Sequence, residues 1–266
     1  MWARIEDVPH PLGPNAEARV LRTADGVRLA ATHLPHPGDT AVVVAHGFSG
    51  THTKPWQARI ARRLARHAGV VAFDFRGHGR SSGVSTLGDL EVLDVDAAVA
   101  WARELGYARV VTCGWSMGAS CVLRHAALVG GADAVVSVSA TSRWRVRDTA
   151  PMRRLHWIVE RPAGRVVGRA LLRIRMARDW EDEPESPVEV AGRVAPAPLL
   201  VVHGDRDTYF SLEHPRALYA AANEPKELWI VPGFAHAESG ATDELLDRIG
   251  AHLPVLLARS RATMRA

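Results

Sequence analysis

The chain has 266 residues, of which 47% are hydrophobic and 23% are charged, with 33 basic and 29 acidic side chains. This balance excludes an intrinsically disordered chain, and no collagen or coiled-coil period is present. The length is ample for one large α/β domain with a buried core. The formal net charge of +4 raises the question of an acidic partner, which depends on where the basic residues lie.

Two features of the sequence bear on the compartment of the protein. Cys113 and Cys121 lie in apolar stretches and are expected to be buried, reduced thiols. The first twelve residues include Arg4, Glu6 and Asp7 and lack the apolar core of a signal peptide. No run approaches the roughly 20 apolar residues that span a bilayer. We therefore expect a cytoplasmic protein without an integral membrane segment.

Short apolar runs alternate with segments of helical periodicity along the chain. The expected strands are residues 20–22, 29–33, 41–45, 70–73, 110–113, 134–138, 198–202 and 227–231. The expected helices are residues 55–67, 90–105, 117–129, 214–222 and 243–257. The first two strands flank the turn Asp25-Gly26 and should pair as an antiparallel hairpin. The alternation predicts an α/β fold with a doubly wound, mostly parallel, eight-stranded sheet covered on both faces.

Residues 141–196 interrupt this alternation. The segment has no strand-like run, and it is too long for a plain loop between two strands of one sheet. Its apolar residues suffice for two amphipathic helices. We therefore expect an α/β core made of residues 1–140 and 197–266, with residues 141–196 as a helical cap folded over one end of the sheet.

The strongest functional signal is the pentapeptide Gly114-Trp115-Ser116-Met117-Gly118, which follows an expected strand and opens an expected helix. A sharp strand-to-helix turn forces its central residue into a strained backbone conformation, so the neighbouring residues must lack bulk. Gly114 and Gly118 meet this need. The turn would expose the Ser116 hydroxyl at the carboxyl edge of the sheet, where it can act as a nucleophile.

A serine hydroxyl needs a base to activate it and an acid to orient that base. The strand at 198–202 is followed by Asp205 and Asp207, and the strand at 227–231 is followed by a segment that ends in His236. Because both segments leave the carboxyl ends of strands, they can converge on Ser116. The order serine, aspartate, histidine is the one expected on this scaffold.

With these motifs the sequence resembles the α/β-hydrolase superfamily over nearly its whole length. The shared motifs are His46-Gly47 after a central strand, residues 74–81, the Gly-x-Ser-x-Gly pentapeptide, His-Gly-x-x-Asp and Gly-x-x-His. The resemblance implies the α/β-hydrolase fold, with Asp207 as the acid in preference to Asp205 and His236 as the base. The single His-Gly pair, in place of the His-Gly-Gly-Gly run of some lipases, is similar to a Gly-His-Gly-x-Ser subgroup that includes small esterases and monoacylglycerol lipases.

The expected chemistry is acyl transfer to water. Backbone N–H groups must stabilise the oxyanion, and the amide of Met117 is one expected donor, while the resemblance implies the amide of Phe48 as the second. We predict hydrolysis of a small-molecule carboxylic ester through an acyl-enzyme. A thioester, an activated amide or a C–C bond next to a carbonyl are alternative substrates for the same triad. A non-catalytic, ligand-binding protein on this scaffold is a further alternative.

No cofactor, metal ion or nucleic acid is expected as a partner. The sequence has no metal-ligand spacing such as His-Glu-x-x-His, no phosphate-binding glycine loop and no nucleic-acid recognition motif. The oligomeric state is left open.

Tryptophans and arginines distinguish the expected cap. Trp115 beside the nucleophile, and Trp144 and Trp157 in the cap, are candidate substrate-binding residues, although packing within the cap would also explain the cap tryptophans. Residues 141–180 carry 11 arginines against three acidic residues, a net charge of +8, so the rest of the chain sums to −4. This charge indicates either a solvated outer face or a region that attracts an anionic substrate or an acidic surface to the site.

Overall fold

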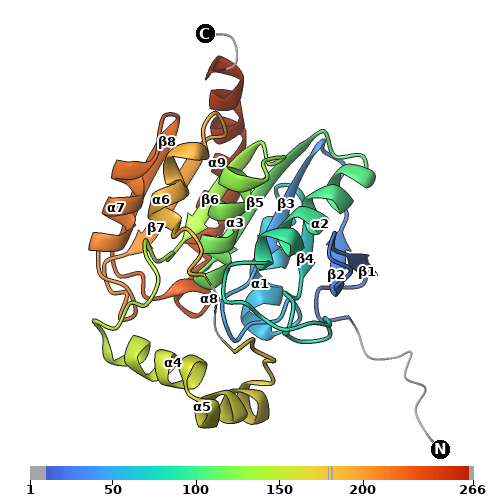
Figure 1. Ribbon diagram of the computed structural model, residues 1–266. Helices are drawn as coiled ribbons and strands as arrows, with labels where there is room; N and C mark the ends of the chain where they lie inside the picture. The colour runs from blue at the N-terminus through green and yellow to red at the C-terminus, as the bar shows by residue number, and fades with distance from the viewer. Residues whose placement is uncertain (1–9, 179, 181, 264–266) are drawn as a thin grey trace, which may run out of the picture.

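The computed structural model describes residues 10–178, 180 and 182–263, and it has helices on both faces of one sheet (Figure 1). The strands are β1 (Glu17–Arg22), β2 (Arg28–Leu34), β3 (Thr40–Ala45), β4 (Gly69–Phe73), β5 (Arg109–Trp115), β6 (Ala134–Val138), β7 (Leu199–Gly204) and β8 (Lys226–Val231). The α-helices are α1 (Pro55–Leu64), α2 (Glu91–Glu104), α3 (Met117–Leu128), α4 (Ala150–Glu160), α5 (Pro162–Val167), α6 (Pro187–Val190), α7 (Glu213–Ala221), α8 (Ala237–Gly240) and α9 (Asp243–Thr263). A π-helix, η2 (Gly168–Leu172), and a 3-10 helix, η3 (Ala191–Arg193), complete the elements used below.

The sheet has eight strands in the order β1-β2-β4-β3-β5-β6-β7-β8. The pairs β1–β2 and β2–β4 are antiparallel, and all other neighbours are parallel. This confirms the predicted doubly wound, mostly parallel sheet with an antiparallel N-terminal hairpin. The chain moves to one side of β3 to form β4 and then to the other side to form β5. Loops after β3 and β5 therefore meet at a switch point, where α/β sheets bind their ligands.

Alternate residues of the central strands face opposite sides of the sheet. Val43 and Val71 pack in the cluster that includes α2, α3 and α7, whereas Val42 and Val70 pack in the cluster that includes α1 and α9. Every residue of β4 and β7 is buried. Strands covered on both faces form continuous apolar runs, which is why the sequence pattern located them.

The two cysteines lie on opposite sides of the sheet. Cys113 belongs to the cluster with α1 and α9, and Cys121 to the cluster with α2 and α3. Both thiols are free and fully buried. Burial raises the pKa of Cys113 to about 12 and also raises that of Cys121, so neither thiol is reactive at neutral pH.

The C-terminal helix is longer than predicted. α9 continues to Thr263, whereas the apolar periodicity predicts an end at residue 257. Among the residues of α9 whose side chains are described, Leu257 is the last that lies in the core, and the helical backbone continues beyond it. Neither α9 nor any other helix within residues 10–178, 180 and 182–263 is long and apolar enough to cross a membrane.

The segment between β6 and β7 divides into two parts. α4, α5 and η2 lie beyond the carboxyl ends of the strands (Figure 1). In contrast, Val190, Ala191 and Val194 of the α6–η3 region are buried in the cluster with α3 and α7. The predicted boundary of the cap at residue 196 is therefore too late, because these apolar residues join the helical layer on the sheet.

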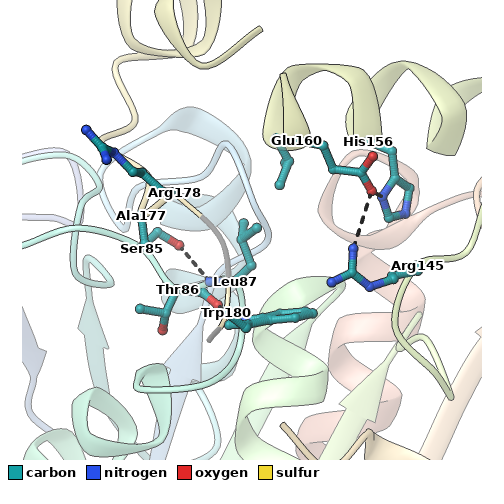
Figure 2. Close-up of a pocket in the computed structure, with 10 residues that line it drawn as sticks. Ser85, Thr86, Leu87, Arg145, His156, Glu160, Ala177, Arg178 and Trp180 are labelled. Atoms are coloured by element: carbon teal, nitrogen blue, oxygen red, sulfur yellow. Dashed lines mark hydrogen bonds and ion pairs between the residues drawn. The ribbon is translucent and has the colours of Figure 1, made fainter. Parts of the chain in front are cut away.

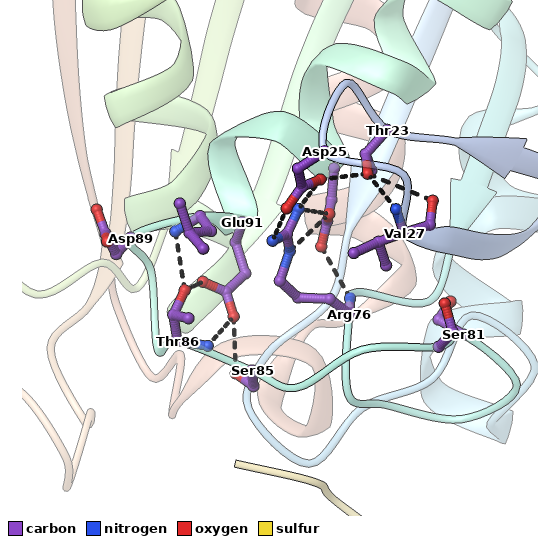
Figure 3. A network of polar contacts seen from close by, with 12 residues as sticks. Thr23, Asp25, Val27, Arg76, Ser81, Ser85, Thr86, Asp89 and Glu91 are labelled. Atoms are coloured by element: carbon purple, nitrogen blue, oxygen red, sulfur yellow. Dashed lines mark hydrogen bonds and ion pairs between the residues drawn. The ribbon is translucent and has the colours of Figure 1, made fainter. Parts of the chain in front are cut away.

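A buried arginine, Arg76, ties the N-terminal hairpin and α2 to the loop after β4 (Figure 3). The Arg76 side chain is 2% exposed, and its Nη2 and Nε lie 2.7 and 2.9 Å from Oδ1 of Asp94 on α2. Its Nη1 lies 2.8 Å from Oδ2 of Asp25 in the hairpin turn. Asp94 also accepts the backbone N–H of Arg76 at 2.8 Å. Three segments that are distant in the chain are thereby held together.

A second buried carboxylate, Glu91, shapes the loop that leads into α2. Its two oxygens accept hydrogen bonds from the Ser85 hydroxyl, the Thr86 amide and hydroxyl, and the Gly88 amide, all at 2.7 to 2.8 Å (Figure 3). The backbone amides of a loop lack the hydrogen-bond partners that a helix or strand provides, and the Glu91 carboxylate accepts hydrogen bonds from two of them. The loop includes Leu87, which lines a cavity next to Ser116.

The Asp94→Ala substitution should lower the free energy of unfolding by about 3–5 kcal/mol, because it leaves the buried Arg76 guanidinium with Asp25 alone. Urea denaturation measures the loss. The control, Asp39→Ala, removes an exposed ion pair with Arg109 and should leave the unfolding midpoint nearly unchanged. Similar midpoints for the two variants would contradict a stabilising role of the buried pair.

Candidate active site

Ser116 occupies the turn between β5 and α3 in a strained backbone conformation. Its φ and ψ are 53° and −116°, a combination that residues with side chains rarely adopt. The Ser116 amide donates to the carbonyl oxygen of Val138 at 2.9 Å, and the Ser116 carbonyl accepts the Ala119 amide at 3.0 Å. Hydrogen bonds on both sides of the residue thus keep Ser116 in this strained conformation.

Two glycines make this turn possible. A Cβ atom on Gly114 would lie 2.2 Å from the carbonyl oxygen of Gly118. A Cβ on Gly118 would lie 2.4 Å from the carbonyl oxygen of Ala45 and 2.6 Å from that of His46. These obstacles are backbone atoms, which cannot turn away as a side chain can. The glycines therefore let α3 approach the end of β3 and set Ser116 beside the loop at residues 46–50.

The structure brings together Ser116, His236 and Asp207. The Ser116 hydroxyl lies 2.9 Å from Nε2 of His236, and Nδ1 of His236 lies 2.8 Å from Oδ2 of Asp207. The alternative acid, Asp205, is exposed and accepts the Gly233 amide at 2.7 Å in the turn after β8. Of the two aspartates, Asp207 is the one that contacts the imidazole.

The Asp207 carboxylate is fully buried. Its neighbours are the imidazoles of His236 and His203 and two backbone amides. Its Oδ1 accepts the backbone amides of Tyr209 and Phe210 at 2.8 and 3.1 Å. Burial alone would raise the pKa of Asp207, but the hydrogen bond and the charge of His236, the Phe210 amide and His203 outweigh burial and lower it. An ionised carboxylate therefore faces Nδ1 of His236 and fixes the tautomer of the imidazole.

Two aromatic rings hold the His236 imidazole from the sides. The Tyr209 ring stacks on it with a centroid distance of 4.3 Å and an interplanar angle of 26°. The Phe210 ring meets it edge-on at 5.5 Å. Sequence reasoning missed both residues, although they follow Asp207 by two and three positions. Their contact with His236 depends on the path of the loop after β7.

Phe48 and Met117, the two expected oxyanion donors, flank Ser116 at the smaller of its cavities. Phe48 and Met117 line a cavity together with Ser116. Within the described part of the chain, neither amide nitrogen has a hydrogen-bond acceptor. Two free N–H groups next to a serine hydroxyl can receive a developing negative charge on a substrate oxygen.

His46 fixes the loop that carries Phe48. Its Nδ1 donates to the carbonyl oxygen of Gly47 at 2.7 Å, and its Nε2 accepts the Phe75 amide at 3.1 Å. One ring nitrogen is a donor and the other an acceptor, so the imidazole is neutral. Burial, followed by the nearby His78, lowers the pKa of His46 to about 3, in agreement with this neutral form.

Glu238 is a residue of the site that sequence reasoning missed. Its Oε1 accepts the Gly47 amide at 2.5 Å and lies 3.4 Å from Nε2 of Gln57. A Cβ on Gly47 would be 3.1 Å from both carboxylate oxygens and 3.2 Å from Cβ of Ser116. The carboxylate therefore braces the loop beside the nucleophile. An acidic residue two positions after His236 was the available signal.

Two cavities meet at Ser116. The larger one, of about 780 Å³, is lined by His236, Glu238 and residues of α1 and α4. The smaller one, of about 120 Å³, is lined by Met117, Trp144 and Phe210, among others. Within the described ranges, no group of three or more His, Cys, Asp and Glu side chains is placed to hold a metal ion.

A third cavity, of about 60 Å³, continues the smaller one away from Ser116. The two share Leu87, Arg145, His156, Val159 and Trp180. Figure 2 shows His156 and Glu160 on α4 facing Arg145, with Leu87 and its neighbours on the opposite side. The pocket beside Ser116 therefore extends to the charged side chains of Arg145 and Glu160 at its far end.

The three candidate tryptophans have different positions. Trp144 lines the smaller cavity, and its ring lies 5.5 Å from that of Trp180. Trp115 is fully buried in the core, because strand alternation points its side chain to the face with α1 and α9. Trp157 is 49% exposed and lines neither cavity at Ser116. Trp115 and Trp157, two of the expected substrate-binding residues, therefore lie outside both cavities at Ser116.

Comparison with known proteins agrees with this architecture. The sequence profile of a family described as alpha/beta hydrolase fold matches residues 40–163. The protein YfhR of Escherichia coli O157:H7 is 27% identical over 234 residues, which cover 85% of this chain and 75% of YfhR. The protein Rv2307c of Mycobacterium tuberculosis is 29% identical over 239 residues, which cover 86% of this chain and 73% of Rv2307c.

Solved structures of similar fold include esterases. The esterase Pf2001 of Pyrococcus furiosus superposes with a TM-score of 0.72 and 24% identity, over 90% of this chain and 92% of the esterase. Est1E of Butyrivibrio proteoclasticus, solved with ferulic acid bound, has a TM-score of 0.60 and 19% identity, over 90% of this chain and 98% of Est1E. At these identities the likeness shows the fold.

The Asp207→Asn variant should be less sensitive to acid than the wild-type protein. The pKa of Asp207 is lower in the folded chain than its ordinary value of 3.8. The ionised carboxylate therefore stabilises the fold fully above about pH 3.8. This contribution is lost as the pH falls through the lower pKa of the folded state. Urea midpoints measured from pH 6 to pH 2.5 should fall more steeply for the wild type.

The control is Asp205→Asn, which leaves the contact between Asp207 and His236 in place and should follow the wild-type curve. If all three proteins lose stability in parallel, the depressed pKa of Asp207 is refuted.

Proposed function

The chain belongs to the α/β-hydrolase superfamily, and on this premise we propose that it is a serine hydrolase that cleaves carboxylic esters through an acyl-enzyme. The observation that carries the proposal is the chain of contacts from Asp207 through His236 to the Ser116 hydroxyl, at 2.8 and 2.9 Å. The similarity in fold to the esterase Pf2001 supports the same chemistry.

The triad accounts for the proton movements of the reaction. Nε2 of His236 takes the hydroxyl proton as Ser116 Oγ attacks the ester carbonyl, and the resulting imidazolium then protonates the leaving alcohol. Asp207 holds the imidazole and stabilises its charged form. In the second half of the reaction His236 activates water, which attacks the acyl-enzyme and releases the acid and free Ser116.

The free amides of Phe48 and Met117 form the proposed oxyanion hole. They are backbone groups held by α3 and by the His46-braced loop, so they need no rearrangement when charge develops on the carbonyl oxygen. Glu238 acts on this hole indirectly. Its bond to the Gly47 amide orients the His46–Gly47 peptide, one peptide before the Phe48 amide.

The alcohol part and the acyl part of the ester occupy different cavities. His236 must reach the leaving-group oxygen, and it lines the larger cavity but not the smaller one. The alcohol part therefore occupies the larger cavity, and the acyl part occupies the smaller one beside Met117. The small volume of the acyl side favours a short or compact acyl group, and the larger side accepts a bulkier alcohol.

We assign α4, α5 and η2 to a cap over the nucleophile. Met152, Leu155, His156 and Val159 of α4 line the smaller cavity. Their spacing of three and four residues places them on one side of the helix. The cap therefore shapes the acyl pocket, while the sheet supplies the triad.

The Ser116→Ala substitution should abolish hydrolysis of p-nitrophenyl acetate, with a loss of several orders of magnitude in kcat, because the nucleophile is absent. The variant should keep its melting temperature and fail to react with a fluorophosphonate probe. Near-normal activity of Ser116→Ala would overturn the assignment. Failure of the probe to label the wild-type protein at Ser116 would favour the non-catalytic alternative.

The Trp144→Ala substitution should change the preference among acyl groups. It enlarges the acyl cavity, so kcat/KM should rise for long or aromatic p-nitrophenyl esters relative to the acetate. The aromatic series is included because Est1E, of similar fold, binds ferulic acid. Matched acyl-thioesters in the same panel test the thioester alternative.

The matched control is Trp157→Ala, a tryptophan of the same cap that lies outside both cavities. Its acyl preference should equal that of the wild type. An equal change of acyl preference in both variants would contradict the assignment of Trp144 to the acyl pocket.

A further inference from the structure

Three large apolar side chains are exposed on the helical elements of the cap. Trp157 on α4 is 49% exposed, Val166 on α5 is 68% exposed and Leu171 in η2 is 77% exposed. Single exposed apolar residues are ordinary. Here three occur within fifteen residues, on consecutive helical elements that lie apart from the sheet (Figure 1). Burying their side chains in an apolar environment would be favourable.

Unpaired arginines occur in the same segment as these side chains. Residues 150–173 include six arginines and one acidic residue, Glu160. Arg154, Arg161 and Arg169 are exposed, and none of the three side chains makes a hydrogen bond or ion pair with any described residue. The surface formed by Trp157, Val166, Leu171, Arg154, Arg161 and Arg169 is named the basic cap face.

We propose that the basic cap face docks on the surface of an anionic lipid bilayer. Apolar side chains enter the boundary between headgroups and acyl chains, while guanidinium groups remain at the level of the lipid phosphates. Each arginine near an anionic bilayer strengthens binding by roughly fivefold. Docking of this kind needs no membrane-spanning helix, which agrees with the helices of the described residues.

Charge and polarity together favour a bilayer over other partners. Two copies of the basic cap face would bring arginines against arginines, and the repulsion disfavours a dimer through this surface. A nucleic acid would satisfy the arginines but would leave Val166 and Leu171 facing a charged backbone. An anionic bilayer interface offers acceptors for the arginines and an apolar layer for the exposed side chains.

The basic cap face adjoins the mouth of the cleft that contains Ser116. A groove of about 470 Å³ on the cap is lined by Arg154, Trp157, Ile158 and neighbouring residues. Arg154 and Ile158 also line the larger cavity at Ser116. Docking would therefore bring the opening for substrate close to the lipid surface. The docking itself does not depend on the proposed hydrolysis.

Sedimentation with sucrose-loaded vesicles tests the proposal. The wild-type chain should bind vesicles of equal parts phosphatidylglycerol and phosphatidylcholine, should bind pure phosphatidylcholine at least tenfold more weakly, and should dissociate as salt is raised. Val166→Ser/Leu171→Ser should reduce binding at least tenfold. Arg161→Ala/Arg169→Ala should reduce it roughly 30-fold at low salt.

The matched control is Val20→Ser/Arg22→Ala on the edge strand β1, where both side chains are also exposed. This variant should bind anionic vesicles as the wild type does. All variants should keep the wild-type melting temperature and activity on a water-soluble ester, which separates docking from the proposed hydrolysis.

Three results would overturn the proposal. The first is no binding of the wild type to anionic vesicles. The second is an equal loss of binding in the control and cap variants. The third is a different occupant of the basic cap face. Full displacement by millimolar inorganic phosphate would identify a free anion, and a dimer that Leu171→Ser abolishes would identify a second copy.

Discussion

The close approach of α3 to the end of β3 is the constraint on which the site depends. Gly118 has no room for a Cβ against the carbonyl oxygens of Ala45 and His46, and Gly114 has none against Gly118. This contact forces Ser116 into its strained conformation and, in the same step, places the serine beside the loop that carries Phe48. A single methyl group in this space would separate the nucleophile from the proposed oxyanion hole.

Buried polar groups hold the loops that surround this contact. His46 joins the loop after β3 to Phe75, Glu238 holds the Gly47 amide, and Glu91 gathers the loop before α2. Burying a polar or charged group is costly unless its hydrogen bonds are made. In each case several partners meet this need, so the loops keep one arrangement. The helices and strands position the ends of the loops, and these buried polar side chains fix the loop conformations around the site.

The helix α4 has two faces with different roles. Met152, Leu155 and Val159 line the pocket beside Ser116, while Trp157 faces outward next to Arg154. A surface helix of a globular protein ordinarily turns its polar face to solvent. This helix also carries a large apolar residue there, and the next two elements carry two more. The inner face lines the proposed acyl pocket, and the outer face belongs to the proposed docking surface.

The sequence alone was sufficient to predict the α/β architecture and the position of Ser116 at a strand-to-helix turn, because these depend on strand periodicity and local spacing. The pairing of His236 with Asp207, in preference to Asp205, rested on the resemblance to the α/β-hydrolase superfamily. The sequence also located the concentration of arginines in the cap. The tertiary structure decided which tryptophan reaches the site. Strand alternation buries Trp115 and helix periodicity exposes Trp157, and neither follows until the faces of β5 and α4 are known. Tyr209, Phe210 and Glu238 gain their roles through contacts across the fold, and their positions two or three residues after Asp207 or His236 do not by themselves reveal those contacts.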